Sequence, residues 1–219
     1  MTSLEDHPAV ERTNWRSLAI KTGIGAVAGA LGAIGLMELI DSGALGALDT
    51  SREIAALVGM LYLMTAAVVG FGLVSPDAGS RLLNVEDADE LREMRPMLRW
   101  SVLGTASIAA ILFIAAFAAP AGPIGAPVAL ALVAILFVLA CYTGHRQRAH
   151  TDELMRAVSV EGTSAAFYLT VVVGGGWALL AHLGYLAGPE PLDWLTMFAS
   201  LMLLGCFVIT IQRGLIRRS

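Results

Sequence analysis

Six long apolar runs, separated by short charged segments, constrain this chain more than any other feature. They lie at about 17–40, 54–75, 100–119, 124–143, 163–186 and 193–212. Roughly 20 apolar residues, each rising 1.5 Å along an α-helix, cross the hydrocarbon core of a bilayer. The runs lack the alternation of membrane-barrel strands, and only 15% of the residues are charged. We therefore expect six transmembrane helices that fill a domain over 17–212.

The positions of the basic residues predict how these helices are threaded. With the tail 1–16 in the cytoplasm, every Lys and Arg except Arg52 falls on the cytoplasmic side. Cytoplasmic segments of membrane proteins carry such an excess of positive charge. The predicted fold is an all-α integral membrane protein of three helical hairpins, with the tail 1–16 and the basic tail 213–219 both cytoplasmic.

The cytoplasmic segment before the third run has two faces if it is helical. Glu86, Glu90 and Glu93 fall on one face, and Arg92, Arg95 and Arg99 fall roughly opposite. The arginine face suits contact with anionic headgroups, and the acidic face is a candidate docking surface that faces water or a partner. Snorkelling arginines above a solvated acidic face are the simpler interpretation. Pro96 is expected to kink this helix, because proline lacks the backbone N–H.

The next cytoplasmic segment, "TDELMRAVSVEG" at 151–162, begins the fifth helix before the membrane. Thr151 or Asp152 can cap it, and the acid at 152 precedes Arg156 at the favourable i, i+4 spacing. Glu153 and Glu161 are not needed to start a helix. We therefore include Asp152, Glu153, Arg156 and Glu161 among the candidate docking residues. "ADEL" at 88–91 and "TDEL" at 151–154 suggest a weak repeat of the last two hairpins.

The segment "DELMRAVSVEG" fits a D-E-x-x-R-x-x-x-x-E-[AG] pattern through Asp152, Glu153, Arg156, Glu161 and Gly162. It resembles the loop before the C-terminal helical hairpin of small, uncharacterised bacterial inner-membrane proteins. The resemblance covers the last third of the chain. It implies a bacterial origin and a location in the inner membrane. It also supports the topology, and it implies no activity.

Two glycine clusters within the runs are candidate packing or moving parts. Gly25, Gly29 and Gly32 form a small-residue face on which a helix of this chain, of a second copy or of another protein could pack closely. Gly174, Gly175 and Gly176 are consecutive, which favours either a hinge or a packing notch for a bulky neighbour.

The apolar runs lack several residue types and motifs that catalysis or ion transport needs, and this reduces the number of possible functions. Their centres carry no charged residue, which weighs against a proton- or cation-coupled transporter. His145 and His150 share a cytoplasmic segment and His182 lies near the other side, so neither haem nor a specific metal site is predicted. No hydrolase, zinc-protease or phosphate-loop motif occurs. We expect no cofactor, no catalytic or metal-binding residues and no nucleic-acid partner.

Three functions remain open. The favoured one is a non-catalytic accessory, assembly or scaffold protein that contacts membrane lipids and binds another membrane protein or a second copy of itself. The alternative is a small-molecule or lipid transporter or channel acting as an oligomer. The least favoured is a membrane enzyme or electron carrier that uses His145, His150, Asp152 and Glu153.

The predicted threading is testable with topology reporters. A reporter fused after Arg148 is expected to be active in the cytoplasm, and one fused after Pro191 is expected to be active outside, because the basic segments hold their side of the membrane. The opposite pattern, or two fusions on the same side, would contradict the six-helix topology.

Overall fold

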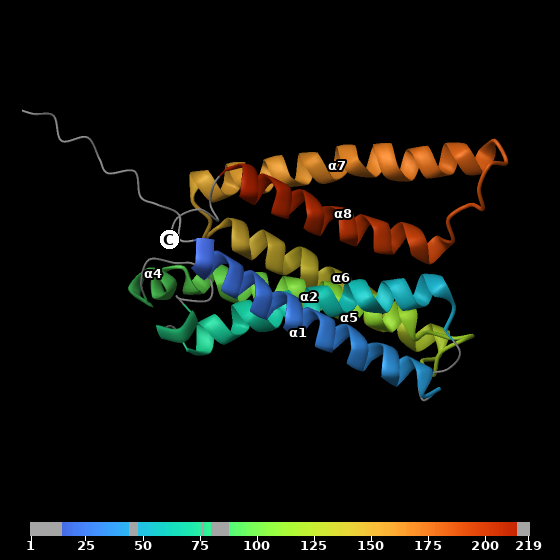
Figure 1. The fold of residues 1–219 in the computed structure, drawn as a ribbon, viewed down its shortest axis with the longest axis horizontal. Helices are drawn as coiled ribbons and strands as arrows, with labels where there is room; N and C mark the ends of the chain where they lie inside the picture. Colours follow the sequence, from blue (N-terminus) through green and yellow to red (C-terminus); the bar gives the residue numbers. More distant parts are fainter. Residues whose placement is uncertain (1–14, 44–47, 76, 80–87, 214–219) are drawn as a thin grey trace, which may run out of the picture.

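The computed structural model describes residues 15–43, 48–75, 77–79 and 88–213 (Figure 1). Within these residues it is helical, without a β-strand. The elements are α1 (Trp15–Asp41), α2 (Thr50–Val74), α4 (Ala88–Glu93), α5 (Arg95–Ala116), α6 (Ala126–Arg148), α7 (Glu153–His182) and α8 (Pro191–Gln212). The prediction of an all-α chain is therefore confirmed.

Five of these helices, α2, α5, α6, α7 and α8, are long and apolar enough to cross a membrane, among the residues described. They coincide with the second to sixth apolar runs, although α7 begins ten residues before the run at 163, as the cap at residue 152 predicts. The chain is accordingly a multi-pass membrane protein by length and composition. Helix α1 coincides with the first run, and its passage through the membrane stays a prediction.

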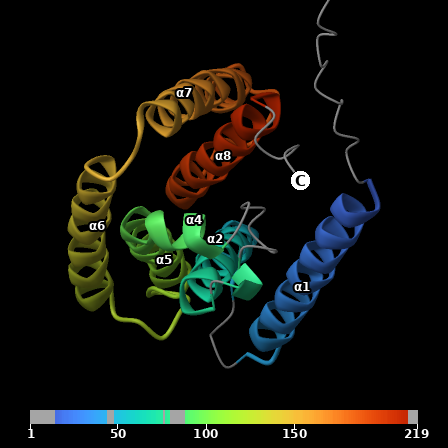
Figure 2. The ribbon, with the colours of Figure 1, turned by 90° about the vertical axis from the view of Figure 1, so that its left-hand side faces the viewer.

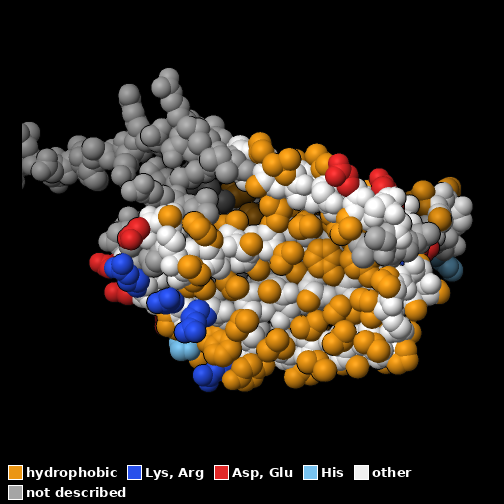
Figure 3. Space-filling model, turned by 90° about the horizontal axis from the view of Figure 1, so that it is seen from below, with side chains coloured by type: hydrophobic (Ala, Val, Ile, Leu, Met, Phe, Trp, Pro, Cys, Tyr) orange, Lys and Arg blue, Asp and Glu red, His pale blue; other side chains and the backbone are white. Residues whose placement is uncertain are grey.

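The long helices alternate in direction, so that α1 begins and α8 ends at the same end of the molecule (Figure 1). Lysine and arginine side chains gather at this end, and apolar side chains cover much of the surface beyond it (Figure 3). We call it the basic end. Of the described side chains, it holds Arg92, Arg95, Arg99, Arg146, Arg148, Arg156 and Arg213, which all lie at or near helix ends.

Helices α2 and α5 form the centre of the fold, with α1 on one side and α6 on the other (Figure 2). Small residues allow this pair to approach closely: Ala55, Ala56, Ala109 and Ala116 are buried. A Cβ added at Gly59 would lie 3.3 Å from the Cβ of a leucine on α5. Close contact of this kind supplies the dispersion energy that holds helices together where lipid offers no hydrophobic drive.

Arginines join α2 and α5 at both ends. Arg52, in the first turn of α2, donates to the carbonyl oxygens of Ala116 and Ala118 at 2.9 and 2.5 Å, at the end of α5. At the basic end Arg95, the first residue of α5, donates to the carbonyl of Leu73 on the last turn of α2 at 3.4 Å. Helix C-termini leave such carbonyls without intrahelical donors, and they carry partial negative charge that favours a cation.

The α7–α8 hairpin packs through glycines. A Cβ added at Gly205 would lie 2.7 Å from the carbonyl oxygen of Gly162 and 2.9 Å from the nitrogen of Ala166. The hairpin joins the central pair through α8, where the Tyr62 hydroxyl donates to the carbonyl of Ala199 at 2.8 Å. Glycines 162 and 205 therefore set the distance between α7 and α8.

The two "DEL" segments do not fold alike. The break expected at Pro96 is present, because α4 ends at Glu93 and α5 begins at Arg95. Leu91 on α4 is 1% exposed, whereas Leu154, at the matching position on the unbroken helix α7, is 49% exposed. One segment is thus a separate short helix anchored by a leucine, and the other is the first turn of a long helix.

The glycine contact between α7 and α8 predicts the effect of two matched substitutions. Gly205→Ala is expected to lower the free energy of unfolding by about 1–3 kcal/mol, because the new Cβ meets backbone atoms that cannot move aside. Gly175→Ala, on α7 with no atom within 4 Å, is expected to be neutral or to stabilise by up to about 1 kcal/mol. Thermal unfolding in detergent measures both, and equal effects would contradict this packing.

Candidate functional site

The glycine face predicted on α1 is only partly covered. A Cβ added at Gly32 would lie 3.3 Å from the Met64 sulfur on α2. At Gly25 and Gly29 an added Cβ would meet no described atom within 4 Å. Three partners were considered for this face. Among the described residues, a helix of the same chain contacts it at Gly32, and none contacts it at Gly25 or Gly29.

The three consecutive glycines lie inside α7, which continues as a regular helix to His182. A Cβ at Gly174 would lie 2.5 Å from the Met197 methyl carbon and 3.0 Å from the Trp194 ring. Gly174 is thus the packing notch for bulky residues of α8. Gly175 and Gly176 have open space instead. A hinge at Gly175 and Gly176 stays a prediction.

The charged faces predicted around α4 are both largely at the surface. Glu86 lies outside the described residues, and Glu90 and Glu93 are exposed. Arg92 forms an ion pair with Asp89 at 2.5 Å. Arg95 and Arg99 are exposed, and Arg95 also bonds to the end of α2 as described above. Contact of these arginines with headgroups stays a prediction.

Most residues of the "TDELMRAVSVEG" segment have a structural partner. The Asp152 side chain caps α7 by accepting from the Met155 nitrogen at 2.7 Å. Arg156 does not pair with this carboxylate as its spacing suggested. It donates instead to the Arg148 carbonyl at 3.4 Å, on the last residue of α6. The exposed Glu153 has no bond that the structure describes.

Glu161 is held by a residue far along the chain. Both of its carboxylate oxygens accept from the guanidinium of Arg213, which caps the end of α8. This hydrogen-bonded pair raises the pKa of Arg213 above its ordinary value. A Cβ added at Gly162, the next residue, would lie 3.3 Å from the Cα and Sγ atoms of Cys206 on α8. These two positions of the segment therefore secure α7 to α8.

The structure also shows a site that the sequence analysis missed, a cleft of about 1240 Å³ between α6 and α7. Although α6 and α7 follow each other in the chain, α6 packs on α5 and α7 packs on α8. Figure 2 shows the two helices standing apart around their short connection. The walls of the cleft are the end of α6, the first half of α7, Met97 of α5, and Cys206 and Thr210 of α8.

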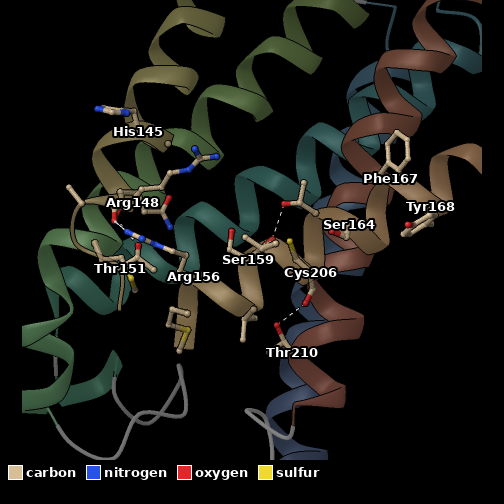
Figure 4. A pocket seen from close by; sticks show the side chains of 18 residues that line it. His145, Arg148, Thr151, Arg156, Ser159, Ser164, Phe167, Tyr168, Cys206 and Thr210 are labelled. Carbon is tan, nitrogen blue, oxygen red and sulfur yellow. Dashed lines mark hydrogen bonds between the residues drawn. The ribbon is translucent and has the colours of Figure 1, made fainter. Parts of the chain in front are cut away.

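The cleft is polar at the basic end and more apolar away from it (Figure 4). Arg148 and Arg156 lie together at one end, and Phe167 and Tyr168 lie at the other. Hydroxyl and thiol groups line the stretch between them. His145 also belongs to the lining, but Figure 4 shows its ring pointing away from the other labelled residues.

The electrostatic character of the cleft is positive. The described residues that line it include two arginines and no Asp or Glu. Asp152 and Glu161, which lie nearby in sequence, are engaged by the helix cap and by Arg213. An arginine carries five N–H donors, so the single bond from Arg156 to the Arg148 carbonyl leaves donors for an anion.

No grouping of three or more His, Cys, Asp and Glu residues that would hold a metal ion occurs in the part of the chain that the structure describes. Cys141 and Cys206 are free thiols. What the arrangement offers is binding, with cationic donors beside an apolar wall. No family model, curated protein or solved structure matches this chain.

The pairing of Glu161 with Arg213 predicts a charge-exchange result. Glu161→Arg and Arg213→Glu are each expected to lower the melting temperature slightly, because each places like charges together at the end of α7–α8. The double exchange is expected to restore it. Glu153→Arg, an exposed acid on the same helix, serves as the control. If the double exchange were worse than either single change, Glu161 would not be held by this pair.

Proposed function

We propose that this chain crosses the inner membrane of a bacterium six times, with both of its ends in the cytoplasm. The long helices alternate in direction, and the described basic side chains other than Arg52 lie at one end of the bundle, which supports an even number of crossings. In this orientation the basic end is cytoplasmic, and the cleft between α6 and α7 opens in the cytoplasmic half of the membrane.

Its proposed role is that of a non-catalytic accessory, assembly or scaffold protein. The observation that carries this role is the open glycine face of α1. Small residues face a neighbouring helix closely at Gly59, Gly162 and Gly205, whereas Gly25 and Gly29 face no described atom within 4 Å. Small residues spaced four apart let two helices approach closely in lipid. The occupant we propose is a helix of another membrane protein or of a second copy.

The exposed acids at the basic end fit the same role. Glu93 on α4 and Glu153 on α7 are exposed, and neither caps a helix nor joins two helices in the described structure. With Glu90 they give the cytoplasmic surface an acidic component that a partner with basic residues could bind. They would add specificity and speed of association more than affinity.

The proposed role is tested by capturing partners with matched variants of α1. Gly25→Leu with Gly29→Leu is expected to abolish co-purification of a stoichiometric partner, or of a second copy, from mild detergent, because leucines prevent close approach. Gly23→Leu with Ala30→Leu is the control, since by the 3.6-residue period these exposed positions lie on the opposite side of α1. Quantitative mass spectrometry and the mass of the complex in solution give the readout.

Two results would contradict the accessory role. One is a wild-type chain that purifies as a partner-free monomer, and the other is equal loss of the partner in both double variants. A partner-free chain would favour the second candidate, a small-molecule or lipid transporter or channel. The observation that favours this candidate is the cleft, which offers a positive end and an apolar wall to an amphiphile entering sideways from the membrane.

A further inference from the structure

The cleft between α6 and α7 combines two features that amphiphilic anions need, a positive end and a long apolar wall. We propose that it binds an anionic phospholipid from the cytoplasmic leaflet, with the phosphate at Arg148 and Arg156 and an acyl chain along α7. This inference deepens the second function above by naming its ligand class, and it rests on the proposed orientation of the chain in the membrane.

The phosphate position follows from the charges that face the cleft. Guanidinium groups bind phosphate oxygens with paired N–H donors. Arg148 and Arg156 lie at the same end of the cleft (Figure 4), and neither forms an ion pair with a described residue. No described lining residue is acidic, so an anion there would meet no negative charge that repels it. Basic pockets between membrane helices on the cytoplasmic side are suited to anionic lipid headgroups.

The position of the acyl chain follows from distance. Arg156 and Tyr168 are twelve residues apart on one helix, which corresponds to about 18 Å along its axis. Half of a bilayer's hydrocarbon core is roughly 15 Å thick. A headgroup at Arg156 therefore places an acyl chain beside Phe167 and Tyr168, which are exposed apolar surfaces in the cleft wall.

The shape of the cleft favours a lipid over a soluble phosphate. Its volume of about 1240 Å³ exceeds the roughly 300–1,000 Å³ typical of small-molecule pockets. Val158, Val160 and Met155 add apolar surface that a free phosphate or a small phosphate ester would leave uncovered. Since α6 and α7 do not pack along their length, a lipid can enter sideways from the leaflet without any helix having to move.

The test is lipid titration of the full purified chain in mild detergent, followed by native mass spectrometry. The probes are phosphatidylglycerol, phosphatidylcholine with the same acyl chains, and glycerol 3-phosphate as the soluble source of the same phosphate chemistry. We expect one phosphatidylglycerol to bind more tightly than phosphatidylcholine, and far more tightly than glycerol 3-phosphate. Arg148→Gln with Arg156→Gln is expected to weaken phosphatidylglycerol binding about 25-fold, at roughly fivefold per arginine.

A matched pair of charge variants and a matched pair of steric variants decide the outcome. Arg92→Gln with Arg99→Gln removes the same charge from the basic end outside the cleft and is expected to change binding less than about threefold. Ser164→Trp fills the cleft wall and is expected to abolish the bound lipid. Val172→Trp, on the exposed side of α7 beyond the cleft, is expected to have no effect.

Three results would overturn the site. The first is that both arginine pairs weaken lipid binding equally, and the second is that Ser164→Trp binds lipid fully. The third is that glycerol 3-phosphate binds as tightly as phosphatidylglycerol, which would assign the arginines to a soluble anion. Ser164→Trp leaves both arginines in place, so it still decides the matter if the arginine variant fails to fold. A lipid that binds but does not move between leaflets in liposomes would refute transport and leave the site intact.

Discussion

The carbonyl groups at the ends of the helices impose the constraint on which this fold depends. Each α-helix leaves its last carbonyls without intrahelical donors, and such groups are costly near an apolar medium. Three arginines in the first turn of one helix supply donors to the end of an antiparallel neighbour. Arg52 donates to a carbonyl at the end of α5, Arg95 to one at the end of α2, and Arg156 to one at the end of α6. The first two bonds run in opposite directions between the same helices, so α2 and α5 are bonded to each other at both ends. The partial negative charge at each helix C-terminus favours these cations.

The remaining helices attach to this central pair with decreasing contact. Helix α6 packs on α5, where the buried Thr143 lies 3.0 Å from the position of a Cβ at Gly104. Helix α8 packs on α2, and Tyr62 bonds to it across the interface. Helix α1 contacts α2 through a narrower face that includes Gly32. Helix α7 depends on α8 for its packing, and its bonds to α6 lie at the basic end. The surfaces of α1 and α7 that no described helix covers follow from this decrease in packing.

The sequence predicted the helices well and their contacts poorly, for physical reasons. Hydropathy, Pro96 and Asp152 act locally, and so the apolar runs, the break before α5 and the cap of α7 could be found from the chain alone. Which helices meet depends on residues far apart. The partner of Glu161 lies 52 residues away, and the cleft draws its walls from four helices. The glycines on α1 were the predicted packing face, whereas the closest approach of a described glycine to the backbone of another long helix joins Gly205 to Gly162.

The cleft lies between two helices that no described glycine contact brings together. The closely packed pairs α2–α5, α5–α6 and α7–α8 each have a glycine that brings a helix against its neighbour. No glycine of α6 or α7 makes such a contact across the cleft: a Cβ added at Gly144, in the wall formed by α6, would meet no described atom within 4 Å. Among the described residues, the hydrogen bonds that join this part of the chain to α6 lie at the basic end, where Thr151 and Arg156 donate to carbonyls of the last turn of α6. Because α6 and α7 are joined at the basic end and separated along their length, the cleft between them is open to the membrane. Its positive charge lies at the joined end.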